Sequence, residues 1–106
     1  MYRGTTPTLT FTLPFPCDQI NYVSIAFAQK KTPYDKDATL VMEKLLTDCR
    51  ADGNTLSLTL SESDTLAFDC HFPVEIQLRV KCNGASMASD IITEDVQRIL
   101  KDGCLP

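Results

Sequence analysis

The sequence predicts an all-β fold, an antiparallel β-sandwich of six to seven short strands with one short helical turn. Apolar and polar residues alternate with a period of two in most segments, and no long segment has helical periodicity. Two turn signals of the hairpin type, Asp52-Gly53-Asn54 and Asn83-Gly84, separate alternating segments. With 106 residues, the chain fits one domain over 1–106, of which we expect 98–106 to be a tail.

Four segments alternate clearly enough to predict strands. Pro14 and Pro16 end the first strand because proline removes a ladder donor. Between 75 and 81 every second residue is polar or charged, so that strand has one face in water. The apolar members of the four segments are Leu9, Phe11 and Leu13; Val23, Ile25 and Phe27; Leu56, Leu58 and Leu60; and Val74, Ile76, Leu78 and Val80.

Two segments leave alternatives open. Residues 38–49 have apolar side chains at both odd and even positions, which fits a helix or a strand covered on both faces. The turn at 52–54 favours a strand that pairs with the segment after the turn. Residues 87–92 are expected to form a strand. Beyond them Thr93 could cap a helix, but we favour a strand into the middle nineties. Ser61 is the expected N-cap of the short helical turn.

Charge and composition exclude several classes of protein. The formal net charge is −4 and the longest basic run is Lys30-Lys31, so we expect no nucleic-acid binding. No apolar run is long enough for a signal peptide or a transmembrane helix, so we expect a cytoplasmic protein without membrane contact. The five cysteines, Cys17, Cys49, Cys70, Cys82 and Cys104, cannot all close into intrachain disulfides, and we expect free thiols.

No catalytic residue, cofactor-binding residue or metal ligand is assigned, no cofactor is expected, and the chain is not expected to be an enzyme. His71 follows Cys70, but neighbours in an extended chain point to opposite faces and cannot form a nucleophile–base pair. No C-x-x-C pair offers a zinc site. Asp35-Lys36-Asp37 lacks the glycine and glutamate of a calcium loop. Turn and helix-start roles explain Glu62, Asp64 and Asp69.

One surface invites a partner. Thr8, Thr10 and Thr12 alternate with apolar residues in the first strand, and threonine and serine do the same over 55–61. Hydroxyl-rich sheet faces and open edge strands suit lateral packing against another protein.

Several segments together resemble small, uncharacterised proteins encoded in prophages of Gram-positive gut bacteria. These segments are Arg3–Leu13, Ile25–Gln29, Asp64–Phe68, Val74–Val80 and Ala88–Ile92. The start and the strand rhythm are also distantly similar to the immunoglobulin-like N-terminal domain of phage baseplate upper proteins. Thr5 stands where that pattern usually has aspartate.

The resemblance implies a non-enzymatic structural or assembly protein that binds itself or other phage tail or baseplate proteins, with the virion as one expected location. It brings no site residues with it. Two alternatives remain open: a carbohydrate- or host-surface-binding module using Tyr2, Tyr22 or Tyr34, and an intracellular effector that binds a host protein.

Overall fold

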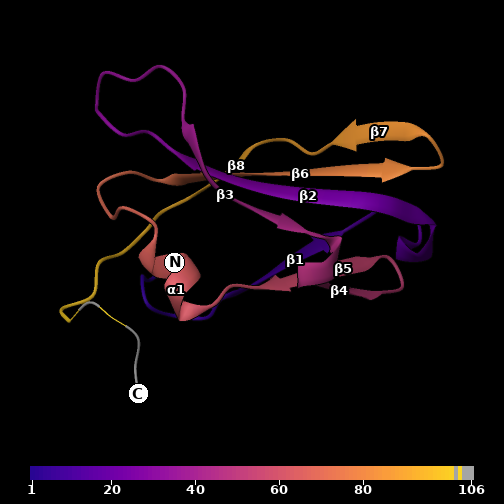
Figure 1. The fold of residues 1–106 in the computed structure, drawn as a ribbon, viewed down its shortest axis with the longest axis horizontal. Coiled ribbons are helices and arrows are strands. Elements are labelled where there is room, and N and C mark those ends of the chain that lie inside the picture. Colours follow the sequence, from indigo (N-terminus) through magenta and orange to yellow (C-terminus); the bar gives the residue numbers. More distant parts are fainter. Residues whose placement is uncertain (102, 104–106) are drawn as a thin grey trace.

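Two antiparallel sheets build the chain in the computed structural model, which describes residues 1–101 and 103 (Figure 1). The predicted all-β sandwich class is confirmed. The strands are β1 (Thr8–Thr12), β2 (Ile20–Gln29), β3 (Thr39–Leu45), β4 (Cys49–Asp52), β5 (Thr55–Thr59), β6 (Val74–Cys82), β7 (Ala85–Ala88) and β8 (Ile92–Glu94). The helical elements are α1 (Glu62–Leu66) and the 3-10 turns η1 (Cys17–Gln19) and η2 (Leu46–Asp48).

The order of the strands is that of an immunoglobulin sandwich lacking its first strand. The smaller sheet has the order β1-β5-β4, and the larger sheet has the order β3-β2-β6-β7, with β8 also paired to β6. Taken in chain order, β1 to β7 correspond to the immunoglobulin strands B, C, C′, D, E, F and G. Strand A would lie beside B at the edge of the smaller sheet. Here that place, next to β1, holds no strand of the described chain.

The core lies between the sheets, where the alternating apolar residues meet. Val23, Ile25 and Phe27 of β2 are fully buried, as period-two alternation predicts. The segment after α1 closes one end of this core, because Phe68 packs on Phe27 with ring centroids 5.8 Å apart. Ser61 caps α1 as predicted, since its side chain accepts the Asp64 N–H at 3.1 Å.

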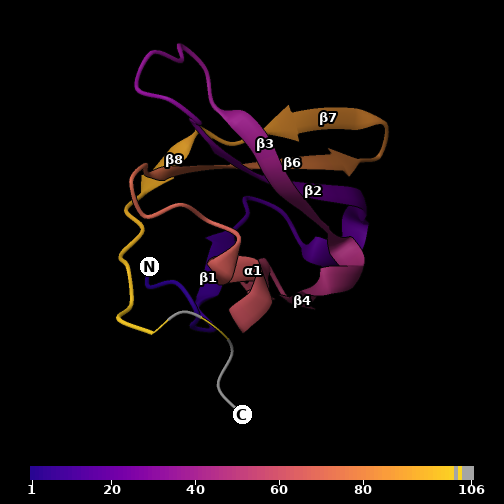
Figure 2. The same ribbon diagram turned by 60° about the vertical axis from the view of Figure 1, so that its left-hand side comes forward.

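Residues 38–49 differ from the prediction. They form a strand, but β3 pairs with β2 and not with the segment after the turn. Turn η2 then carries the chain from β3 in the larger sheet to β4 in the smaller one (Figure 2). The separate strand β4 pairs with β5. Strand β3 is not covered on both faces, because Leu40, Val41 and Leu45 are 58%, 38% and 38% exposed. A hairpin signal alone does not reveal the transfer between sheets.

The region after β6 also differs in part. The Asn83-Gly84 hairpin has positive φ at both centres, 51° and 83°, as predicted. The single strand expected over 87–92 is wrong: β7 ends at Ala88 and β8 begins at Ile92, and the two pair with different halves of β6. The expected extension into the middle nineties is confirmed by β8. The tail expected over 98–106 falls partly outside the described residues.

No helix in the described part of the chain is long and apolar enough to cross a membrane.

Candidate functional site

An apolar groove runs along the side of the sandwich between the edge strand β1 and the edge formed by β7 and β8. Its volume is about 560 Å³. The segment from β1 to Phe15 forms one wall, and residues of β6, β7 and β8 form the other. The lining residues are Thr10, Phe11, Thr12, Leu13, Pro14, Phe15, Leu78, Val80, Met87, Ala88, Ser89 and Ile92. None of these twelve carries a charge, although charged residues make up 23% of the chain.

Two residues of the larger sheet face inward at this groove and are still exposed. Met87 pairs with Val80 and Ile92 pairs with Ile76, so each shares the core-facing side of the sheet with its partner. Val80 and Ile76 are only 6% and 3% exposed, whereas Met87 and Ile92 are 40% and 47% exposed. Because the smaller sheet ends at β1, no strand of the described residues covers these two side chains.

The outer edge of β1 also presents unpaired backbone groups. Leu60 N–H donates to the Pro7 carbonyl at 3.0 Å, and Leu13 N–H donates to the Asn54 carbonyl at 2.8 Å. These two bonds fix the phase of the antiparallel ladder, in which alternate residues bond to the partner strand. The backbone groups of Leu9 and Phe11 therefore point toward β5. Those of Thr8, Thr10 and Thr12 point away from it, where no described strand pairs with them.

The hydroxyl-rich surface predicted from sequence lies on the outer face of the same sheet. Thr8, Thr10 and Thr12 pair with Thr59, Ser57 and Thr55 across β1 and β5. The Thr8 and Thr59 hydroxyls are hydrogen-bonded at 2.9 Å. The two threonine- and serine-bearing segments are thus neighbours, and they form one continuous polar face.

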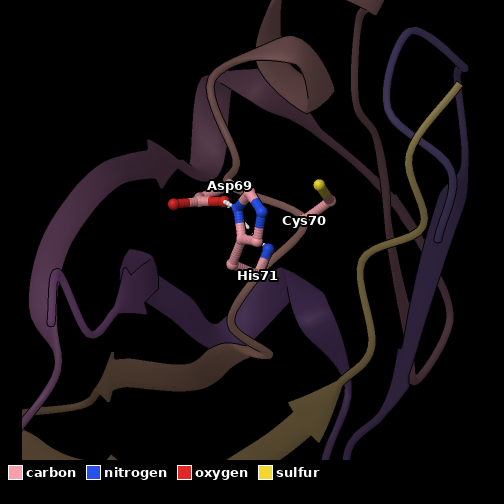
Figure 3. A group of neighbouring side chains, drawn as sticks. All are labelled: Asp69, Cys70 and His71. Carbon is pink, nitrogen blue, oxygen red and sulfur yellow. Dashed lines mark hydrogen bonds and ion pairs between the residues drawn. The ribbon is translucent and has the colours of Figure 1, made fainter. Parts of the chain in front are cut away.

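The turn at Asp69-Cys70-His71 brings three metal-ligating residue types together (Figure 3). The prediction that Cys70 and His71 lie on opposite faces of an extended chain is wrong, because both lie in a turn with donor atoms within 4.8 Å of one another. His71 Nδ1 lies 2.7 Å from Asp69 Oδ1. The hydrogen bonds from the His71 backbone N–H and ring lower the pKa of Asp69.

This turn is an incomplete set of ligands for zinc, which takes four ligands in a structural site. Three successive residues supply at most three donor atoms, and the two outer residues are exposed. Asp69 is already bonded to His71, and the charge of Arg3 also acts on its carboxylate. We therefore assign this cluster a hydrogen bond between His71 and Asp69 and no metal.

The cysteines of the described residues and the Asp35 turn, also considered from the sequence, do not line the groove. Cys17, Cys49, Cys70 and Cys82 are free thiols, as predicted, and Cys104 lies outside the described residues. Burial raises the pKa of Cys17 and of Cys49. The Asp35 carboxylate accepts the N–H groups of Lys31 and Thr32 and so stabilises a turn, as expected.

The carboxylates near α1 have structural partners. Burial opposes ionisation of Asp64, but hydrogen bonds from Ser61 and Lys44 outweigh it and lower the pKa of this carboxyl. Lys44 Nζ lies 3.1 Å from Asp64 Oδ1 and ties β3 to α1. Asp69, in contrast, is bonded to His71.

Sequence reasoning missed a polar cleft on the outer face of the larger sheet. Its volume is about 290 Å³, and Tyr22, Glu43, Arg79 and Lys81 are among its lining residues. Tyr22 Oη donates to Glu43 at 3.3 Å, and Ser24 Oγ donates to the same carboxylate at 3.0 Å. The residues come from β2, β3 and β6, so only the order of the strands brings them together.

No family model, curated protein or solved structure matches this chain. The fold and the groove define the class: an immunoglobulin-like β-sandwich with an uncharged groove beside an open strand edge.

Proposed function

We propose that this chain is a non-enzymatic, phage-derived structural or assembly protein that binds itself or other phage tail or baseplate proteins. The resemblance of the segments at 3–13, 25–29, 64–68, 74–80 and 88–92 to prophage proteins is what supports the phage origin.

The observation that carries the binding role is the uncharged groove beside β1. Exposed apolar residues that are contiguous and surrounded by polar surface are typical of protein interaction sites. In this groove they adjoin unpaired backbone groups of an edge strand, which is a second feature that favours contact with another chain. A groove without charged residues fits an uncharged segment of protein better than a nucleic acid or a charged metabolite.

The test is mass spectrometry of phage particles purified after induction of the source strain. A virion component is expected at a stoichiometric copy number relative to tail proteins. Its absence would exclude a virion role, and a pull-down from phage-infected cells against a pull-down from host lysate would then separate an assembly factor from an effector of a host protein.

A carbohydrate-binding role is the second candidate, and the cleft at Tyr22 favours it. An exposed aromatic ring beside a carboxylate and a guanidinium offers both stacking and hydrogen bonds to a sugar. Binding on a glycan array that Tyr22→Ala abolishes and Tyr34→Ala leaves unchanged would support this role. An array without any signal from the unmodified protein removes it.

A further inference from the structure

We propose that the groove beside β1 accepts one extended strand from a partner protein, which completes the smaller sheet at the place of the missing first strand. This inference rests on the proposed protein-binding function and specifies its site and the chemistry of the partner.

The topology defines the place. Four strands of the larger sheet lie side by side in the order β3-β2-β6-β7, whereas the smaller sheet has three, in the order β1-β5-β4. The uncovered inward-facing side chains, Met87 and Ile92, lie on the side where the smaller sheet ends. A strand added beside β1 would cover them, as the first strand of a complete immunoglobulin sandwich does.

The backbone supplies the binding groups. The N–H and C=O groups of Thr8, Thr10 and Thr12 point outward, and an incoming strand can pair with all of them. In strand addition, main-chain hydrogen bonds give the affinity, while pockets for alternate side chains give the specificity. β1 itself carries no charge, no proline and no bulge, the features with which natural edge strands usually prevent pairing.

The groove defines the chemistry of the partner strand. Every second side chain of the partner strand would enter the groove and contact Phe11, Met87 and Ile92 of this chain. We therefore expect the partner to carry apolar residues at these alternate positions. The residues between them extend the polar face of Thr8, Thr10 and Thr12, where serine and threonine fit. Since the twelve lining residues are uncharged, a charged side chain entering the groove would be desolvated without a counter-charge.

The second wall of the groove favours a single segment over a folded copy of this chain. An incoming strand must fit between β1 and the wall made by β7 and β8. A free extended segment meets this condition. The β1 strand of a second copy would bring its own larger sheet, with β7 at its edge, toward the same space.

The test uses the full chain and a synthetic peptide, Thr-Val-Thr-Ile-Thr-Val-Thr with blocked ends. The control peptide has the same composition with its three apolar residues consecutive. Binding is measured by fluorescence anisotropy under reducing conditions, and backbone amide exchange is followed residue by residue. We expect saturable binding of the alternating peptide at least tenfold tighter than that of the control, with slower exchange at Thr8, Thr10 and Thr12.

Two matched variants locate the site. Met87→Lys places a charge in the groove at a side chain that is 40% exposed, so the fold tolerates it. Leu40→Lys makes the same change on β3, at the opposite edge of the larger sheet, where the side chain is 58% exposed. We expect Met87→Lys to weaken peptide binding at least tenfold and Leu40→Lys to leave it unchanged, with both variants retaining the circular dichroism spectrum of the parent.

Three results would overturn the proposal. They are no peptide binding at millimolar concentration, binding without protection of the β1 amides, and protection of these amides that depends on protein concentration without peptide, which would make a second copy the occupant. The particle experiment is independent of these measurements. If the protein binds the peptide but is absent from particles, the virion role is removed and the strand site is kept. If the protein is present in particles but does not bind the peptide, only the strand site is removed.

Discussion

The side-chain amide of Gln29 holds the backbone of Asp69 from both sides. Gln29 Oε1 accepts the Asp69 N–H at 2.9 Å, and Gln29 Nε2 donates to the Asp69 carbonyl at 2.8 Å. The same nitrogen donates to the Phe72 carbonyl at 2.8 Å. Gln29 is only 4% exposed, so the end of β2 fixes the turn that carries His71 through a buried network.

Replacing this amide should therefore be costly. Gln29→Met keeps the approximate length of the side chain but leaves the N–H of Asp69 and two carbonyls without a partner, and we expect a loss of about 3 kcal/mol in the free energy of unfolding. Urea denaturation measures it. The exposed Gln19→Met is the control, for which we expect a change within about 0.5 kcal/mol. Equal effects in the two variants would contradict the role given to the network.

The buried hydroxyl of Thr65 joins α1 to the N-terminal segment. It donates to the Thr5 carbonyl at 2.9 Å and accepts the Thr5 N–H at 3.1 Å, and Thr65 is fully buried. Thr65→Val preserves the shape and removes both bonds, so we expect a loss of about 2 kcal/mol in unfolding free energy. The same substitution at the exposed Thr93 should cost far less. Thermal unfolding of the two variants and of the parent measures the two losses of stability.

The carboxylate of Asp64 should make stability depend on pH. Its pKa is lower in the folded protein, so its contribution is complete above the ordinary aspartate pKa of about 3.9 and is lost as pH falls through the folded value. We expect Asp64→Asn to lower stability by about 1 kcal/mol at pH 7, with the difference from the parent disappearing in strong acid. Asp37→Asn is the control. If the difference in unfolding free energy between the parent and Asp64→Asn stays constant from pH 7 to pH 2, ionisation of Asp64 is not its cause.

The hairpin turn at Gly53 tests a purely conformational cost. Gly53 has φ of +59°, and a Cβ added there meets nothing within 4 Å. We expect Gly53→Ala to lower the unfolding free energy by about 1 kcal/mol, because only the left-handed backbone conformation opposes it. Gly53→Asn should lose less, since asparagine tolerates this conformation. Identical losses in the two variants would point to a steric cause instead.

Local pattern was sufficient for the clearly alternating strands, the cap and the two hairpin turns. Alternation along Leu56–Leu60 and Val74–Val80 predicts strands with one buried face, and both form because a period of two places alternate side chains on one side of a sheet. Ser61 caps α1 and Asn83-Gly84 forms a type I′ turn, since each depends only on residues nearby in the chain.

Pairing partners and the groove could not be obtained in the same way. That β3 joins β2, and that Tyr22 lies opposite Lys81, depends on which strands lie side by side, which a single sequence does not encode in any local signal. The turn at Asp69 is similar, because a buried amide forty residues earlier determines its conformation.

The sequence by itself determined the all-β class and the strands with one clear apolar face, because both depend on the order of residue types along the chain. Only the tertiary structure decided that the smaller sheet ends at β1 while the larger sheet continues to β7. The groove follows from this difference in width. Met87 and Ile92 have the apolar character of core residues, and they stay exposed because no strand of the described chain lies opposite them.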